Sequence, residues 1–170
     1  MNANDYANYL PKDFDNFDCL KLAPGIYLIL LFVLRAYMVW IMSVTNMRDH
    51  TGIISWIYPQ TALFYLNLVS GVIGLFIVLI ISLRRPNAAA WVRVCWQQCK
   101  LLLFIALGFD LLVGVLGYFI WQLQSVTWLV VHCSLVISAI VYIVRSKRFI
   151  INLTEFPETL PEKKHKRVNH

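Results

Sequence analysis

The stretch LAPGIYLILLFVLRAYMVWIMSVT, residues 22–45, decides the fold of this chain. Roughly 20 apolar residues are enough for a helix to cross the hydrocarbon core of a bilayer, and this stretch is long enough. It carries a single charged residue, Arg35, near its middle. The stretch therefore predicts a membrane-spanning helix with a permanent cation inside it. The rest of the chain must bury or neutralise that cation.

The composition of the whole chain also indicates a membrane protein. The chain has 170 residues, of which 59% are hydrophobic and 14% are charged. A soluble domain has about 45–50% apolar residues, so the excess is expected to face lipid. Residues 1–21 are polar and acidic, unlike a cleavable signal peptide. The first span is therefore expected to remain in the mature protein.

Further long apolar stretches follow the first one, at residues 61–83, 101–121 and 126–144. Backbone groups in lipid must be satisfied within helices. The sequence therefore predicts an all-α, four-span transmembrane helical bundle. No span shows the Gly/Pro-interrupted pattern, paired across two halves, that is typical of many transporters.

Two shorter segments are expected at the membrane surface. Residues 86–100 repeat Trp and Cys at helical spacing, which predicts a short interfacial helix between spans two and three. Residues 53–58 are apolar and aromatic but too short to span, and Pro59 ends them. They predict an interfacial segment in the first loop.

The positive charges predict the orientation. Lys12 and Lys21 precede the first span, the second and third spans are separated by a basic loop, and the fourth is followed by another basic run. Arg48 is the one cation in the opposite loops. The positive-inside rule places both termini in the cytoplasm. Residues 1–21 are expected to form a mobile polar tail, and residues 149–170 a basic, disordered tail.

Arg35 and Asp110 are predicted to form an intramembrane ion pair. Each lies about 10 residues from the outer end of its span, near 15 Å deep at about 1.5 Å per residue. One interpretation is that the pair only locks helix one against helix three. A second is that it gates a proton or binds an anionic substrate. A third is that Arg35 reaches outward alone and Asp110 is protonated.

Asn67 and His132 lie at a similar level, roughly 10 Å below the outer ends of their spans. With Arg35 and Asp110 they predict a small polar cavity in the outer half of the membrane. A histidine inside a span is more often a hydrogen-bonded packing residue than a proton relay, so both interpretations of His132 stay open.

Small residues predict close helix packing in two spans. Small side chains let helix backbones approach each other in lipid, and spans two and three carry Ser70, Gly71, Gly74, Gly114 and Gly117. These faces are the expected docking surfaces for a neighbouring helix or a partner.

No pattern in the sequence indicates catalysis. A Gly-rich phosphate loop, a nucleophile elbow and a metalloprotease helix motif are all missing from the sequence. Cys95 and Cys99 have a spacing that metal sites can use, but a zinc site needs about four ligands. We therefore expect no enzyme, no cofactor and no metal. Because the basic residues flank apolar spans, we expect the lipid bilayer, and no nucleic acid, as a partner.

Three runs of residues carry a resemblance to a known family. They are FDCLKLAPGIYLILLFVLRAYM, WIYPQTALFYLNLVSG and LRRPNAAAWVRVCWQQCKLLL. With them, the part of the chain from residue 14 to residue 150 resembles the YfeZ-like family of small bacterial inner-membrane proteins. The resemblance implies a multi-span protein of the inner membrane of a Gram-negative bacterium. That family has no known function, so the resemblance implies no catalytic residues.

Two functions fit these observations. The first is a non-enzymatic protein that acts through helix or protein contacts, either with another membrane protein or with a second copy of itself. The second is a small transporter or ligand-binding membrane protein that uses the Arg35, Asp110, Asn67 and His132 side chains.

Overall fold

The computed structural model describes residues 9–10, 13–15, 17, 19–45, 54, 57–58, 60–121 and 126–157. The helices are α1 Pro24–Val33, α2 Arg35–Thr45, α4 Thr61–Leu83, α5 Ala90–Gln97, α6 Cys99–Trp121, α7 Val126–Arg145 and α8 Lys147–Thr154. Within these residues the only pairing of β type is an isolated bridge between Phe14 and Leu20. The all-α class predicted by the sequence is therefore confirmed for the described chain.

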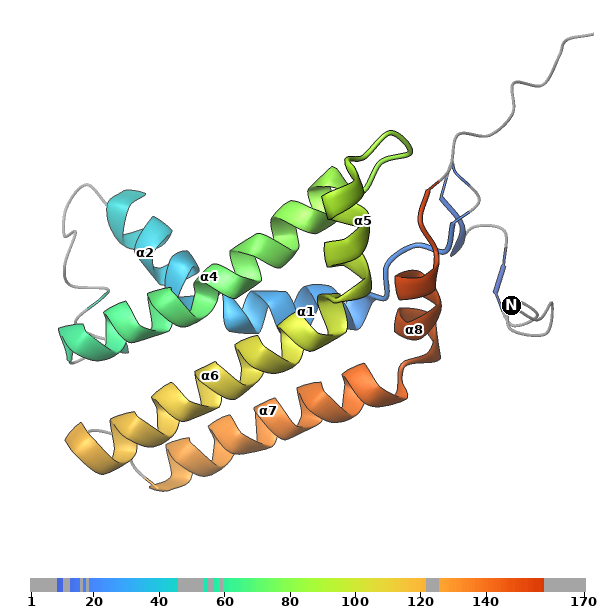
Figure 1. The fold of residues 1–170 in the computed structure, drawn as a ribbon. Helices are drawn as coiled ribbons and strands as arrows, with labels where there is room; N and C mark the ends of the chain where they lie inside the picture. Colours follow the sequence, from blue (N-terminus) through green and yellow to red (C-terminus); the bar gives the residue numbers. More distant parts are fainter. Residues whose placement is uncertain are drawn as a thin grey trace, which may run out of the picture.

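Three of the helices, α4, α6 and α7, are long and apolar enough to cross a membrane. They have 23, 23 and 20 residues, or about 30–35 Å at about 1.5 Å per residue. α4 packs beside α6, and α6 packs beside α7 (Figure 1). Their outward faces carry exposed apolar side chains such as Val72, Leu112 and Val130. Such faces suit contact with lipid.

The first apolar stretch is broken into two helices. α1 and α2 are bent by 64° at Leu34, where the backbone has φ −87° and ψ 8°. The sequence predicts one span over residues 22–45 and shows no interruption there, because neither glycine nor proline lies at the break. The candidate spans therefore number three in the described chain, or four if the bent pair counts as one.

At one end of the long helices, α5 and α8 meet the N-terminal segment (Figure 1). The predicted amphipathic segment forms α5, but Val92, Trp96 and the following Cys99 are buried against protein. Cys99 therefore packs in the core, whereas Trp91 is 47% exposed.

Parts of both predicted tails pack against the helices. Disorder is expected from residue 149 onward, yet α8 extends to Thr154 and buries Phe149. Likewise Leu20, in the expected mobile tail, is fully buried. Residues 1–8 and the basic run in residues 158–170 lie outside the described residues. So do Pro59 and most of the interfacial segment predicted at residues 53–58.

Asn152 joins these segments. Its side-chain oxygen accepts a hydrogen bond from the Ala23 backbone N–H at 3.1 Å, and its amide nitrogen donates to the Leu20 carbonyl at 2.7 Å. The Asn152 carbonyl accepts from Trp96 Nε1 at 2.8 Å. Asn152 is fully buried, so it satisfies backbone groups that water cannot reach.

The substitution Asn152→Ala should lower the free energy of unfolding by roughly 2–4 kcal/mol, because it leaves two buried backbone groups without partners. Chemical denaturation in a mild detergent measures the change. Asn87→Ala, at an exposed position between α4 and α5, is the matched control and should have no effect. Equal stability of the two variants would contradict the role given to Asn152.

Candidate functional site

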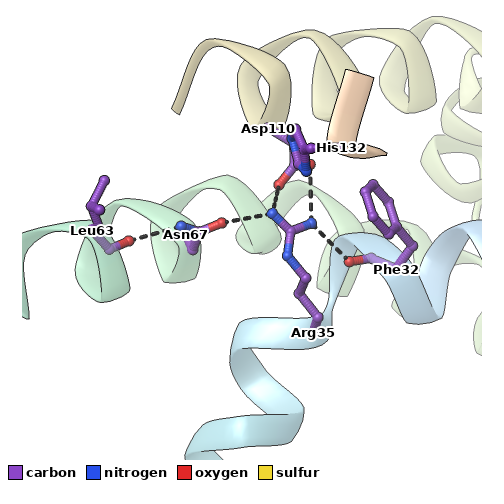
Figure 2. A network of polar contacts seen from close by, with 6 residues as sticks. All are labelled: Phe32, Arg35, Leu63, Asn67, Asp110 and His132. Carbon is purple, nitrogen blue, oxygen red and sulfur yellow. Dashed lines mark hydrogen bonds and ion pairs between the residues drawn. The ribbon is translucent and has the colours of Figure 1, made fainter. Parts of the chain in front are cut away.

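Arg35 is the first residue of α2 and its side chain points from the break toward α4 and α6 (Figure 2). Nη1 donates hydrogen bonds to the Phe32 carbonyl at 3.2 Å and to Asp110 Oδ2 at 3.0 Å. Nη2 lies 3.0 Å from Asp110 Oδ1 and donates to Asn67 Oδ1 at 3.1 Å. The contact with Asp110 is therefore bidentate, the strongest form of an arginine–carboxylate pair.

The break in the first span favours a cation at this place. The last carbonyls of a helix lack intrahelical partners and carry a partial negative charge. Arg35 lies two residues after the last residue of α1 and contacts one of those carbonyls, that of Phe32. The guanidinium carbon also lies 4.7 Å from the centroid of the Phe32 ring, within the range of a cation–π contact.

Asp110 lies on α6 and its side chain is only 1% exposed, whereas that of Arg35 is 31% exposed. His132, on α7, places Nε2 3.4 Å from Asp110 Oδ2. That distance is long for a hydrogen bond. Nε2 of His132 is buried and forms no hydrogen bond within the described part of the chain. Asp110 therefore faces a firm partner in Arg35 and a looser one in His132.

Asn67 completes the group that the sequence singles out. It lies on α4 and is 7% exposed. Its amide nitrogen donates to the Leu63 carbonyl one turn earlier at 2.9 Å, while its oxygen accepts from Arg35. Both ends of the amide are thus engaged (Figure 2). The structure brings Arg35, Asp110, Asn67 and His132 together, and we call these four residues the polar cluster.

The small residues lie where helices approach one another around this cluster. An added Cβ at Gly114 would lie 2.9 Å from His132 Cδ2, and one at Gly71 would lie 2.7 Å from Tyr37 Cε2. Gly74 faces Val33, Gly117 faces Leu63, and Ser70 is 1% exposed. These faces pack within the chain. The sequence predicts that these residues dock a partner, but they are occupied by neighbouring helices of the same chain. A partner would have to dock on another surface.

Two residues that lie beside the cluster are not among those that the sequence pattern singles out. Phe32 precedes Arg35 by three positions, a helical spacing that could have suggested their contact. Tyr58 lies in the connection between α2 and α4, where no periodicity places it. Burial raises the pKa of Tyr58, and the charge of Arg35 and a side-chain hydrogen bond from it oppose that rise. Tyr58 therefore lies against the cluster.

Metal ligation has no support in the described residues. No group of three or more His, Cys, Asp or Glu side chains there could hold a metal ion.

The described residues line cavities of about 610 and 510 Å³. Both lie at the opposite end of α4 from the polar cluster, around Arg85 and Arg84.

One family model matches this chain, over residues 9–155, and its description is "Protein of unknown function (DUF2919)". The chain belongs to this family. No curated protein and no solved structure matches the chain. The matched range includes the polar cluster, α5 and α8, so the family extends over nearly all of the described fold.

Gly114→Ala should lower the free energy of unfolding by about 1–3 kcal/mol, because the new methyl group must displace the His132 ring. Thermal unfolding in detergent measures the loss.

Gly108→Ala is the matched control on the same helix. Nothing lies within 4 Å of a Cβ added at Gly108. Alanine favours a helix over glycine by about 1 kcal/mol, so this variant should be as stable as the native chain or slightly more stable. A Gly114→Ala variant as stable as Gly108→Ala would show that the packing against His132 is not tight.

Proposed function

We propose that this chain is a multi-pass protein of the bacterial inner membrane, with α1 and α2 forming one broken span and both termini in the cytoplasm. Three apolar helices and the bent pair support four crossings. The basic residues at the end that carries α5 and α8 support a cytoplasmic location for that end. The resemblance to the YfeZ-like family supports the same membrane. In this proposal α5 lies at the membrane boundary, with Trp91 exposed.

The polar cluster acts as a structural clamp, and the protein works without catalysis. The observation that carries this proposal is the number of polar contacts that Arg35 makes. Nη1 and Nη2 donate three hydrogen bonds, to Phe32, Asn67 and Asp110 Oδ2, and Nη2 also lies 3.0 Å from Asp110 Oδ1. A charge in lipid is stable only when it is paired and hydrogen-bonded. The clamp thus ties α2 to α1, α4 and α6.

The clamp fixes the direction of α2. α2 leaves the bundle at 64° to α1 and carries exposed apolar residues, among them Trp40, Ile41 and Met42. α7 is also largely uncovered by other helices. Only 17% of its apolar stretch is buried within the protein, against 33% for α4 and for α6. These faces support a protein that acts through contacts in the membrane, either with another membrane protein or with a second copy.

The variants Arg35→Leu and Asp110→Leu should each destabilise the protein by about 3–5 kcal/mol, because each leaves an unpaired charge in the bundle. The double variant should recover most of that loss, since two apolar side chains replace the pair. Unfolding in detergent and the amount of folded protein in membranes measure both effects. Arg85→Leu, at an exposed position, is the control and should change neither.

The clamp proposal fails if both single variants are as stable as the native chain. It also fails if the double variant is no more stable than the worse single variant.

A transporter or ligand-binding protein is the second candidate, and the break between α1 and α2 favours it. Broken membrane helices form substrate and ion sites in many transporters. Two buried polar atoms, Nε2 of His132 in the cluster and Oγ of Ser70 one turn from Asn67, form no hydrogen bond within the described residues. In this alternative an anionic ligand would compete with Asp110 for Arg35.

Thiol labelling separates the two candidates. A Ser70→Cys variant, made after the native cysteines are replaced by alanine, should not react with a water-soluble maleimide if the cluster is a dry clamp. Asn87→Cys, exposed between α4 and α5, should react fully. Rapid labelling of Ser70→Cys in the folded protein would instead support a hydrated ligand site.

A further inference from the structure

A cavity of about 510 Å³ lies at the end of the molecule that carries α5 and α8. Residues of the N-terminal segment, α1, the end of α4, α5 and the start of α8 line it. Its polar lining includes Lys21, Arg84, Arg148 and Asp15. The cavity is remote from the polar cluster, and the clamp does not use it.

Arg84 lines this cavity and has a hydrogen-bond donor with no acceptor among the described residues. It follows the last residue of α4, and its guanidinium carbon lies 4.6 Å from the centroid of the Trp96 ring. Nη2 donates to the Glu155 carbonyl at 3.2 Å. Nε is buried and forms no hydrogen bond within the described chain. Burial also lowers the pKa of Arg84, so an anion beside it would stabilise its charge.

The side chains that line the cavity carry a net positive charge. Three cations and one carboxylate line it. Two nearby acids have other contacts, because Glu155 Oε2 accepts from the Leu20 N–H at 2.8 Å and Asp13 pairs with Arg148 at 3.6 Å. The Asp13 contact is long and partly exposed, so it binds Arg148 only weakly.

The wall of the cavity on the side of the helix bundle is apolar. Tyr27 lies one turn inside α1 and Ile81 one turn inside α4, and both line the cavity. Tyr27 is 55% exposed. Aromatic rings beside cations at the ends of spans are typical of the level of lipid headgroups. A ligand with a charged head and an apolar tail would therefore match both parts of this cavity.

We propose that this cavity binds the phosphate group of a membrane phospholipid, with Arg84, Arg148 and Lys21 around the phosphate and the acyl chains along Tyr27 and Ile81. Arginine suits phosphate because its planar group presents parallel donors. Basic pockets between membrane helices on the cytoplasmic side bind phosphorylated lipid headgroups in the same way.

The test uses the full chain, purified in detergent and freed of lipid. Phosphatidylglycerol, diacylglycerol and inorganic phosphate are added separately, and the midpoint of thermal unfolding is followed with concentration. We expect phosphatidylglycerol to raise the midpoint of unfolding in a saturable way, and diacylglycerol and inorganic phosphate to leave it unchanged. Arg84→Gln should bind it about tenfold more weakly, the loss expected for charge-assisted hydrogen bonds. Arg85→Gln removes the same charge outside this cavity and should bind as the native chain does.

Lys21→Gln provides a second variant at the exposed rim of the cavity, in case Arg84→Gln fails to fold, and it should weaken binding severalfold. Equal binding by the native chain and by the Arg84 or Lys21 variants would overturn the proposal. Equal stabilisation by inorganic phosphate would overturn the assignment to a lipid, and equal stabilisation by diacylglycerol would overturn the role of the phosphate.

Discussion

A single positive charge in the middle of an apolar stretch, at the break between α1 and α2, constrains much of this structure. Arg35 cannot lose its proton in a protein, so its surroundings must supply acceptors. Asp110 supplies both carboxylate oxygens, and the end of α1 supplies a carbonyl. A continuous helix would have fewer free carbonyls at this point. The bend at Leu34 therefore leaves the carbonyl of Phe32 available to accept a hydrogen bond from Arg35.

Close packing and electrostatics depend on each other around this charge. Gly114 lets the His132 ring lie against α6, and Gly71 lets Tyr37 lie against α4. Larger residues would push these helices apart and lengthen the contacts of about 3 Å that satisfy Arg35. Because Coulomb attraction in a medium of low dielectric constant falls with every increase in distance, small residues contribute to the ion pair without touching it.

The sequence predicts that Arg35 and Asp110 meet, because the rise of a helix per residue is fixed and both lie about 10 residues from an end of their spans. The two residues are 75 positions apart in the chain, and their side chains form a hydrogen bond of 3.0 Å. The break at Leu34 is beyond prediction, since no glycine or proline marks it and the acceptors come from other helices. The packing of the N-terminal segment against Asn152 could not be predicted from the sequence either, because the hydrogen bond from Asn152 to Leu20 joins residues 132 positions apart.

The two arginines differ in what their surroundings leave unsatisfied. Arg35 donates three hydrogen bonds from Nη1 and Nη2 and has a buried carboxylate at its side, so a ligand would have to displace an existing partner. Arg84 contacts an aromatic ring and one carbonyl, but its Nε has no acceptor in the part of the chain that the structure describes. Binding is favourable where donors are unsatisfied before the ligand arrives. Arg35, whose charge lies among apolar helices, therefore holds the helices together. Arg84, at the end that carries α5 and α8, is the arginine that can bind an anion.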